Sequence, residues 1–132
     1  MVQIVVDASV ILAVLLNETT KKAIIKNTQG AEIVSPSSLP WEVGNALSSN
    51  VRKNRISPEQ AIQAAREYQK IDVRLIDIDL EQAIQISNRY RIYAYDAYVL
   101  ECAARLRSPL LCLDSTMSLL AKEMGIELIE VL

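Results

Sequence analysis

The chain has 132 residues, enough for one domain with a full hydrophobic core, and 51% of these residues are apolar. The formal charge of −2 excludes a highly charged disordered chain, and it gives no general attraction to nucleic acid, so such binding would need local patches. The sequence has no histidine, which removes histidine-based hydrolases and the usual zinc ligands, so chemistry at neutral pH would use carboxylates and a hard cation.

Short apolar stretches alternate with helical patterns along the whole chain. We expect strands at residues 2–6, 32–34, 73–76, 109–113 and 126–131. We expect helices at residues 8–16, 19–29, 38–52, 57–70, 79–90, 95–107 and 116–123. No repeat, linker or low-complexity tract divides the chain. The pattern predicts a single α/β domain over residues 1–132 with a mainly parallel sheet.

Several residues mark the ends of these helices. Gly30 has the position of a C-terminal cap, and Pro40 falls in a first helical turn, where its missing N–H is harmless. Ser57 and Gln60 are spaced as a capping box. Asp79 looks like half of a metal-binding DxD motif, but its place at a helix start favours a cap.

The longest apolar run, residues 10–16, is far too short to cross a bilayer, and no basic segment precedes it as in a secretory signal. We therefore expect a cytoplasmic protein without a membrane segment. This helix is apolar all round, which predicts burial on every side, in part by the second subunit of a homodimer. Cys102 and Cys112 lack metal-site spacing and are expected to be buried, reduced thiols.

Four acids fall at distinctive places in this pattern. Asp7 and Asp114 each follow a strand and start a helix, and Glu42 lies in the first turn after the second strand. Because parallel strands end at the same edge of a sheet, these three should gather there. Asp96 follows a helix, so the pattern does not place it. Taken singly, each acid is explained as well by helix capping or by the helix dipole.

Convergence of these acids would favour a metal site. Two carboxylates about 4 Å apart repel by roughly 4 kcal/mol at an effective dielectric of 20, so a cluster needs cations or protons. Mg²⁺ and Mn²⁺ prefer such oxygen ligands. Asn45 shares a helix face with Glu42 and could hold a metal-bound water. Ser9 offers a hydroxyl beside Asp7, although a local hydrogen bond at the helix start is the favoured explanation.

Four short stretches carry a resemblance to a known family. They are IVVDAS at residues 4–9, WEVGNA at 41–46, YDAY at 95–98 and LLCLD at 110–114. On these stretches the chain resembles PIN domains, in particular the VapC-type toxin ribonucleases of type II toxin–antitoxin systems. The likeness covers the whole chain in order, length and strand–helix alternation.

The resemblance implies a three-layer α/β/α sandwich with a parallel sheet of four to five strands. It also implies a Mg²⁺- or Mn²⁺-dependent endoribonuclease that leaves a 5′-phosphate and a 3′-hydroxyl. Such proteins are commonly homodimers, held inactive by a cognate antitoxin. The catalytic, metal-binding acids carried over by the resemblance are Asp7, Glu42, Asp96 and Asp114, with Asn45 and Ser9 beside them.

The chain departs from the family pattern at two places near the last acid. Cys112 stands where many relatives have Ser or Thr, and residues 115–117 contain no acid where many relatives have one. A second metal position should therefore be weak, and we expect one firmly bound ion.

Substrate contacts and rival functions remain open from the residues. Tyr93, Tyr95 and Tyr98 could stack bases but are better explained as packing residues. The basic candidates for RNA contacts are Arg52, Lys53, Arg55, Arg89 and Arg91. One alternative to a nuclease is a non-catalytic RNA- or protein-binding module with an impaired metal site. Another is a flavodoxin-like receiver, although no lysine is suitably placed for it.

Overall fold

A five-stranded parallel sheet forms the centre of the protein. In the computed structural model, which describes residues 2–131, the strand order is β3-β2-β1-β4-β5. The strands are β1 (Gln3–Val6), β2 (Glu32–Pro36), β3 (Arg74–Ile76), β4 (Leu110–Leu111) and β5 (Leu128–Ile129). The α/β class and the parallel sheet predicted from the sequence are confirmed.

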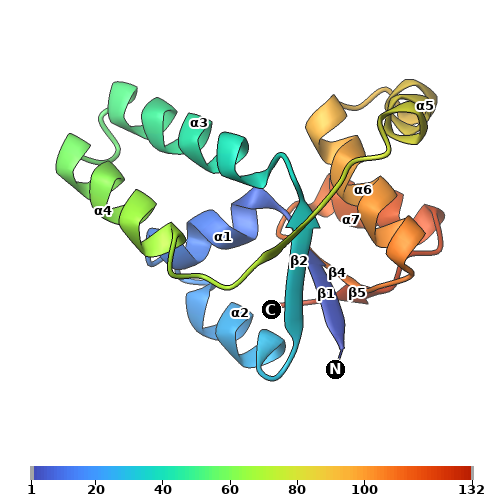
Figure 1. The fold of residues 1–132 in the computed structure, drawn as a ribbon, viewed down its shortest axis with the longest axis horizontal. Coiled ribbons are helices and arrows are strands. Elements are labelled where there is room, and N and C mark those ends of the chain that lie inside the picture. Colours follow the sequence, from blue (N-terminus) through green and yellow to red (C-terminus); the bar gives the residue numbers. More distant parts are fainter. Residues whose placement is uncertain (1, 132) are drawn as a thin grey trace.

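Helices cover both faces of this sheet. They are α1 (Ala8–Leu15), α2 (Lys21–Thr28), α3 (Leu39–Arg52), α4 (Pro58–Tyr68), α5 (Leu80–Tyr90), α6 (Ala94–Leu106) and α7 (Ser115–Glu123). In Figure 1, α1 to α4 lie on one side of the sheet and α5 to α7 on the other, and α3 and α4 extend outward as a helical hairpin. The protein is thus a three-layer α/β/α sandwich. None of the helices within residues 2–131 is long and apolar enough to cross a membrane.

Alternating side chains of the strands build two separate cores. Ile4 and Val6 point into the core shared with α1 to α4, whereas Val5 points into the core shared with α6 and α7. On β4 the same alternation separates Leu111 from Leu110. The C-terminal ends of the strands lie between these two helical layers, and the residues that follow them are therefore held by both cores.

Local signals set the helix ends much as the sequence predicts. Asp79 caps α5, because its side chain accepts a hydrogen bond from the N–H of Gln82. Ser57 and Gln60 form a complete capping box at the start of α4. Gly30 follows α2 with a φ of 76°, a backbone conformation that glycine adopts without strain.

The strand order excludes one of the rival functions. Receiver domains and flavodoxins have the order 2-1-3-4-5, whereas this sheet reads 3-2-1-4-5. In this order the chain moves outward from β1 through β2 to β3 and then returns to the other side of β1 with β4. The topological switch point therefore lies between β1 and β4, and ligands of open α/β sheets bind at such a point.

The apolar helix α1 differs from its prediction. Val10, Ile11 and Ala13 are buried, but Leu12 and Leu15 remain half-buried. Much of the outward cover of α1 comes from α3 and α4 of the same chain (Figure 1). The prediction that this helix is buried on every side is therefore wrong, and α1 gives no reason of its own to place a second subunit there.

Candidate functional site

Two of the four predicted acids flank the topological switch point of the sheet. Asp7 directly follows β1, and Asp114 follows β4, the strand paired with β1. Glu42 comes from the first turn of α3, which follows the next strand, β2. The C-terminal edge of a parallel sheet thus collects these three acids, as the topology argument expects.

Asp7 is held in place by one of its two carboxylate oxygens. Its Oδ1 accepts a 2.7 Å hydrogen bond from the Ser9 hydroxyl and a 3.2 Å hydrogen bond from the N–H of Val10. This is the N-cap of α1, so the capping interpretation of Asp7 is correct. Both hydrogen bonds fall on the same oxygen, and Oδ2 has no hydrogen-bond partner within residues 2–131. Capping therefore leaves half of the carboxylate available.

Glu42 has a similar arrangement on α3. Its Oε2 accepts a 2.7 Å hydrogen bond from the hydroxyl of Ser38, a buried residue one helical turn earlier. Asn45, three residues after Glu42, is exposed and lies on the same face of the helix. Ser38 was missed by sequence reasoning. The signal was available in the i, i+4 spacing of a hydroxyl and a carboxylate at a helix start.

Asp114 and Asp96 complete the set in different ways. Asp114 caps α7, because its Oδ1 accepts a 3.0 Å hydrogen bond from the N–H of Thr116. Asp96 is the third residue of α6, whose N-cap is Tyr93. Within the described residues, the Asp96 carboxylate makes neither a hydrogen bond nor an ion pair. Helix capping therefore does not explain Asp96.

The raised pKa values of three of these carboxylates include repulsion from the other acids of the set. Burial is the main cause that raises the pKa of Asp7, and the charge of Asp96 raises it further, while hydrogen bonds from Ser9 and Val10 oppose the change. Burial likewise raises the pKa of Glu42, with contributions from Asp7 and Asp96. The pKa of Asp96 is raised by burial and then by the charge of Asp114. All four acids are thus electrostatically linked.

No cation of the described chain compensates this negative cluster. The ion pairs within residues 2–131 join Lys70 to Glu67, Arg74 to Glu32, and Arg105 to Glu101. Within the same range, no buried side-chain oxygen lacks a hydrogen-bond partner, so the remaining oxygens of the half-buried acids Asp7, Glu42 and Asp96 must reach solvent. Uncompensated oxygens open to solvent are suitable ligands for a hard divalent cation.

The side chains are not already closed around a metal position. Among the residues from 2 to 131, no group of three or more Asp, Glu or Cys side chains is arranged to hold an ion as it stands. The donor types fit Mg²⁺ or Mn²⁺, but the carboxylates would have to move closer together to share one.

Both cysteines are buried free thiols, as predicted. Burial raises the pKa of Cys102 to about 11. The pKa of Cys112 is raised as well, first by burial, while a hydrogen bond with Ser118 opposes this and the charge of Asp7 adds to it. Cys112 thus lies near the acids, where a protonated thiol is a poor ligand for a hard cation.

Exposed aromatic residues border the acids. Trp41, next to Glu42, is 73% exposed, and Tyr93 and Tyr95, before Asp96, are 84% and 52% exposed. The interpretation of Tyr93 as a packing residue is therefore wrong, whereas Tyr95 is exposed over about half of its surface and packs on one side only. Tyr98 is half-buried and meets Tyr95 edge to face, with ring centroids 5.7 Å apart.

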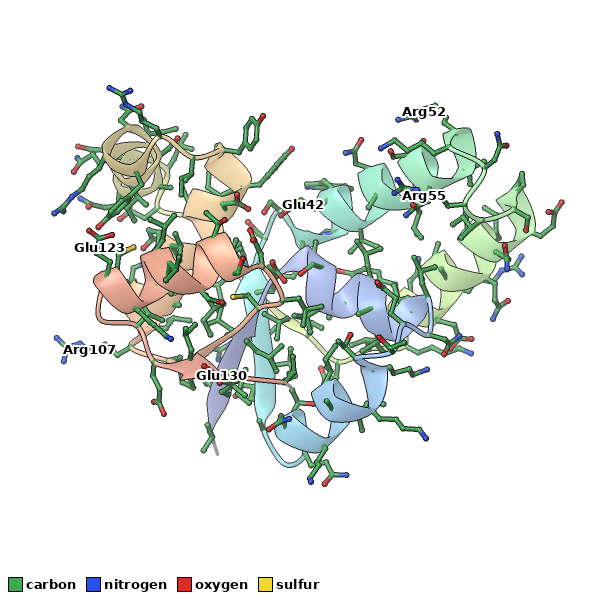
Figure 2. The ribbon with its side chains drawn as sticks, turned by 180° about the vertical axis from the view of Figure 1, so that it is seen from behind. Glu42, Arg52, Arg55, Arg107, Glu123 and Glu130 are labelled. Atoms are coloured by element: carbon green, nitrogen blue, oxygen red, sulfur yellow. The ribbon has the colours of Figure 1, made fainter. Side chains whose placement is uncertain are left out.

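The five basic candidates are all exposed, but they occupy different surroundings. Arg52 donates a 2.7 Å hydrogen bond to the Ser48 hydroxyl, and the guanidinium of Arg89 lies 5.4 Å from the ring centroid of Tyr90. Arg55 shares a cavity with Ser9 and Asp114. Figure 2 shows Glu42 near the middle of the molecule and Arg52 at the outer end of α3.

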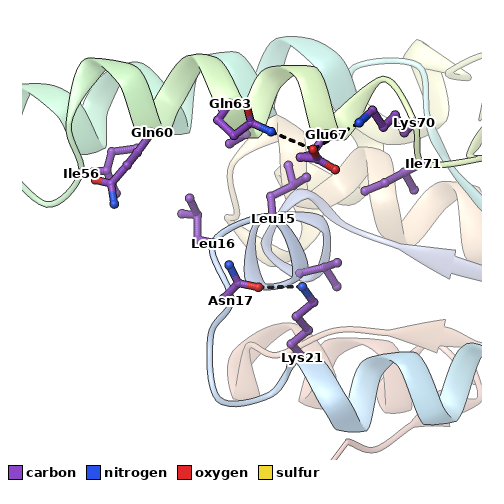
Figure 3. A pocket seen from close by; sticks show the side chains of 12 residues that line it. Leu15, Leu16, Asn17, Lys21, Ile56, Gln60, Gln63, Glu67, Lys70 and Ile71 are labelled. Carbon is purple, nitrogen blue, oxygen red and sulfur yellow. Dashed lines mark hydrogen bonds and ion pairs between the residues drawn. The ribbon is translucent and has the colours of Figure 1, made fainter.

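A second cavity lies away from the acids, between α4 and the end of α1 (Figure 3). It has a volume of about 550 Å³. Its lining mixes apolar and polar residues, and its one carboxylate, Glu67, accepts hydrogen bonds from Gln63 and Lys70. Because that carboxylate is already compensated, we assign no chemistry to this cavity.

Fold and site together define an α/β protein with a cluster of carboxylates at the switch point of its sheet. The chain belongs to the PIN domain family, whose model matches residues 4–123 and whose members are generally nucleases. No curated protein matches this chain.

Two solved structures have a similar fold. PAE2754 from Pyrobaculum aerophilum has a TM-score of 0.68 at 18% identity, over 94% of this chain and 90% of that one. The structure of VapBC2 from Rickettsia felis bound to a DNA fragment from their promoter has a TM-score of 0.66 at 10% identity, over 96% of this chain and 97% of that one. At these identities the comparison establishes the fold alone.

Proposed function

We propose that this protein is a metal-dependent endoribonuclease that hydrolyses RNA phosphodiester bonds. In this proposal Asp7, Glu42, Asp96 and Asp114 hold Mg²⁺ or Mn²⁺ and form the catalytic site. The observation that carries the proposal is a set of mutually repelling carboxylates at the switch point, open to solvent and without a compensating cation in the described chain. Membership of the PIN domain family supports the same chemistry.

In this proposal the four acids hold the metal ion, and the polar residues beside them orient the carboxylates. When bound, the ion supplies an activated water for hydrolysis and offsets charge on the phosphoryl oxygens. Ser9 and Ser38 each fix one oxygen of Asp7 and Glu42, which leaves the other oxygen directed to solvent. Asn45 is free to orient a water or a carboxylate beside Glu42. Cys112, a thiol near this cluster, would keep a second metal position weak.

The substrate is proposed to be single-stranded or looped RNA, because the major groove of duplex RNA is too narrow for side chains to read. Cleavage would leave a 5′-phosphate and a 3′-hydroxyl, as in other members of the resembled toxin group. Exposed basic residues proposed for backbone contacts are Arg52, Lys53, Arg55, Arg89 and Arg91.

A role as the toxin of a toxin–antitoxin pair is part of the proposal. The shared fold with the VapBC2 structure, a complex bound to promoter DNA, supports a cognate antitoxin as partner. We further propose that the protein is cytoplasmic and forms a homodimer. Exposed apolar side chains on α5, such as Leu80 and Ile84, support the dimer, because a second copy would cover them. A sedimentation equilibrium experiment that finds only a 14.7 kDa species at micromolar concentration would contradict the dimer.

A non-catalytic RNA- or protein-binding module is the second candidate. Two observations favour it: no three acids of the described residues are already closed around an ion, and Cys112 lies beside them. Such a module would bind RNA in Mg²⁺ or Mn²⁺ but leave it intact.

An RNA cleavage assay separates the two candidates. The nuclease should cut single-stranded RNA in Mg²⁺ or Mn²⁺, stop when EDTA is added, and lose activity in Asp7→Asn. The amide oxygen of Asn can still accept the hydrogen bonds from Ser9 and Val10, so folding should be kept, as circular dichroism would show. Intact RNA with the wild-type protein in both metals would reject the nuclease and favour the binding module.

A further inference from the structure

A groove beside the acidic site is lined by one basic residue, Arg55. It lies between α1 and the C-terminal end of α3 and has a volume of about 550 Å³. Three leucines line it, together with Ser9, Asp114, Glu18, Asn50 and Arg55. We call this the α1–α3 groove.

One end of the α1–α3 groove opens on the acids. Ser9, Leu12 and Leu16 are spaced along a single face of α1, so the groove follows that helix. From Ser9 to Leu16 the helix advances about 10 Å at about 1.5 Å per residue. Asp114 and the Asp7-bonded Ser9 lie at the end that opens on the acids. Asn50, to whose carbonyl the N–H of Arg55 is bound, lies eight residues after Glu42 on α3, or about 12 Å along that helix.

Arg55 is available at this groove, unlike its neighbour Arg52. The backbone N–H of Arg55 donates a 2.9 Å hydrogen bond to the carbonyl of Asn50, which fixes the turn after α3. Within residues 2–131 its guanidinium makes no ion pair and no hydrogen bond. Arg52 is bound to Ser48, and in Figure 2 it points away from α1, whereas Arg55 lies on the side of α3 that faces α1.

We propose that the α1–α3 groove is a phosphate subsite, in which Arg55 binds a backbone phosphate of the RNA other than the one hydrolysed. This inference rests on the proposed function, since it takes the four acids as the place of cleavage. Guanidinium donors suit phosphate oxygens, and the amide of Asn50 adds a neutral donor beside them. The leucines offer an apolar surface for the sugar of the same nucleotide.

Glu18 brings a negative charge to the same groove, with an effect on RNA binding opposite to that of Arg55. Its exposed carboxylate lines the groove but makes no ion pair with Arg55. It therefore repels a phosphate held there and discourages binding of acidic segments in general. Removing this charge should strengthen RNA binding, whereas removing the charge of Arg55 should weaken it.

RNA binding by charge-neutralised variants tests the subsite. Every protein carries Asp96→Asn so that the RNA stays intact, and a labelled single strand of about 12 nucleotides is titrated by fluorescence anisotropy in Mg²⁺. Arg55→Gln should raise Kd about tenfold, as expected for one charge-assisted contact, and should lower the slope of log Kd against log salt by about 0.7. Arg66→Gln, at an exposed arginine of α4 that is proposed for no RNA contact, is the matched control and should change neither quantity. Glu18→Gln should lower Kd.

The outcomes distinguish this inference from the proposed function. An equal effect of Arg55→Gln and Arg66→Gln, or no effect of Arg55→Gln on RNA affinity, overturns the subsite. Absence of cleavage by the protein without Asp96→Asn, with Arg55-dependent binding retained, would instead reject the nuclease and keep the groove as an RNA site.

Discussion

Helix α6 carries two acids only five residues apart that have opposite surroundings. Glu101 is 4% exposed, and its carboxylate accepts hydrogen bonds of 2.7 and 3.1 Å from Arg105 and one of 3.3 Å from the N–H of Asp79. Asp96, at the N-terminal end of the helix, makes no hydrogen bond or ion pair within residues 2–131. One acid is compensated by its own chain and the other is not.

The comparison separates a structural carboxylate from a candidate functional one. The pair of Glu101 and Arg105 ties α6 to the segment before α5, because Arg105 also donates a 2.7 Å hydrogen bond to the carbonyl of Asp77. Asp96 links no two segments of the described chain, and its pKa is raised by burial and by the charge of Asp114. A partly buried carboxylate without a compensating partner lowers the stability of the folded protein, and such a residue is a candidate for binding a cation.

The largest effect on RNA cleavage should come from Asp96→Asn, which removes a charge at nearly constant side-chain volume. We expect RNA cleavage to fall by about 10³-fold or more, since loss of a direct metal ligand should exceed the 10–100-fold effects of supporting residues. The Tm should stay constant or rise because a repelled charge is removed. Single-turnover cleavage and thermal unfolding measured on the same sample check both halves, and a large fall in Tm would show that Asp96 is structural.

Removing the charge of Glu101 should lower stability and leave cleavage unchanged, the reverse of the result expected for Asp96. Glu101→Gln breaks an ion pair in which Glu101 is buried but the Arg105 side chain is 39% exposed. We therefore expect a loss of about 2 kcal/mol, below the roughly 3–5 kcal/mol for fully buried pairs. This corresponds to a fall in Tm of about 8 °C. Cleavage measured well below the Tm should be unchanged within about twofold. A variant as stable as the wild type would remove the contrast between the two acids.

A smaller effect should appear in the pH dependence of stability. The pKa values of Asp7, Glu42 and Asp96 are raised in the folded protein, so this protein binds protons more readily than the unfolded chain. Their contribution to stability is therefore full below the ordinary values of 3.8 for Asp and 4.5 for Glu, and it is lost as pH rises through the folded values.

Added Mg²⁺ should restore part of this stability where the acids are ionised. At ten times its Kd it should contribute about 1.4 kcal/mol, or about 6 °C in Tm, near pH 7. The increase should shrink toward about pH 5 because protons compete with the ion. Scanning calorimetry with Asp96→Asn as control measures this, and an increase that is independent of pH would point to nonspecific ion effects.

Much of the site follows from chain order. Asp7, Glu42 and Asp114 could be placed at one edge because each follows a parallel strand, and strand direction fixes where such residues lie. The same reasoning could not place Asp96, which follows a helix. Its position depends on how α6 packs over the sheet, a tertiary feature with no local signal, and only the family resemblance indicated it.

The errors also have physical causes. The apolar sequence context of Tyr93 suggests a packing residue, but Tyr93 is the N-cap of α6 and is 84% exposed. The ion pair of Glu101 and Arg105 is not among the predicted features, although a charged residue inside the apolar run 99–104, four residues before an arginine, is a signal for it. For residues 10–16, apolar composition indicates that the helix is covered but cannot tell whether α3 and α4 or a second subunit covers it.

Calorimetric titration of Mn²⁺ into the protein at neutral pH tests the central claim most directly, which is that the uncompensated carboxylates form a cation site. We predict saturable binding of one ion per chain, lost in Asp96→Asn and retained in Glu101→Gln. Absence of saturable binding by the wild-type protein, or equal binding by Asp96→Asn, would contradict the account.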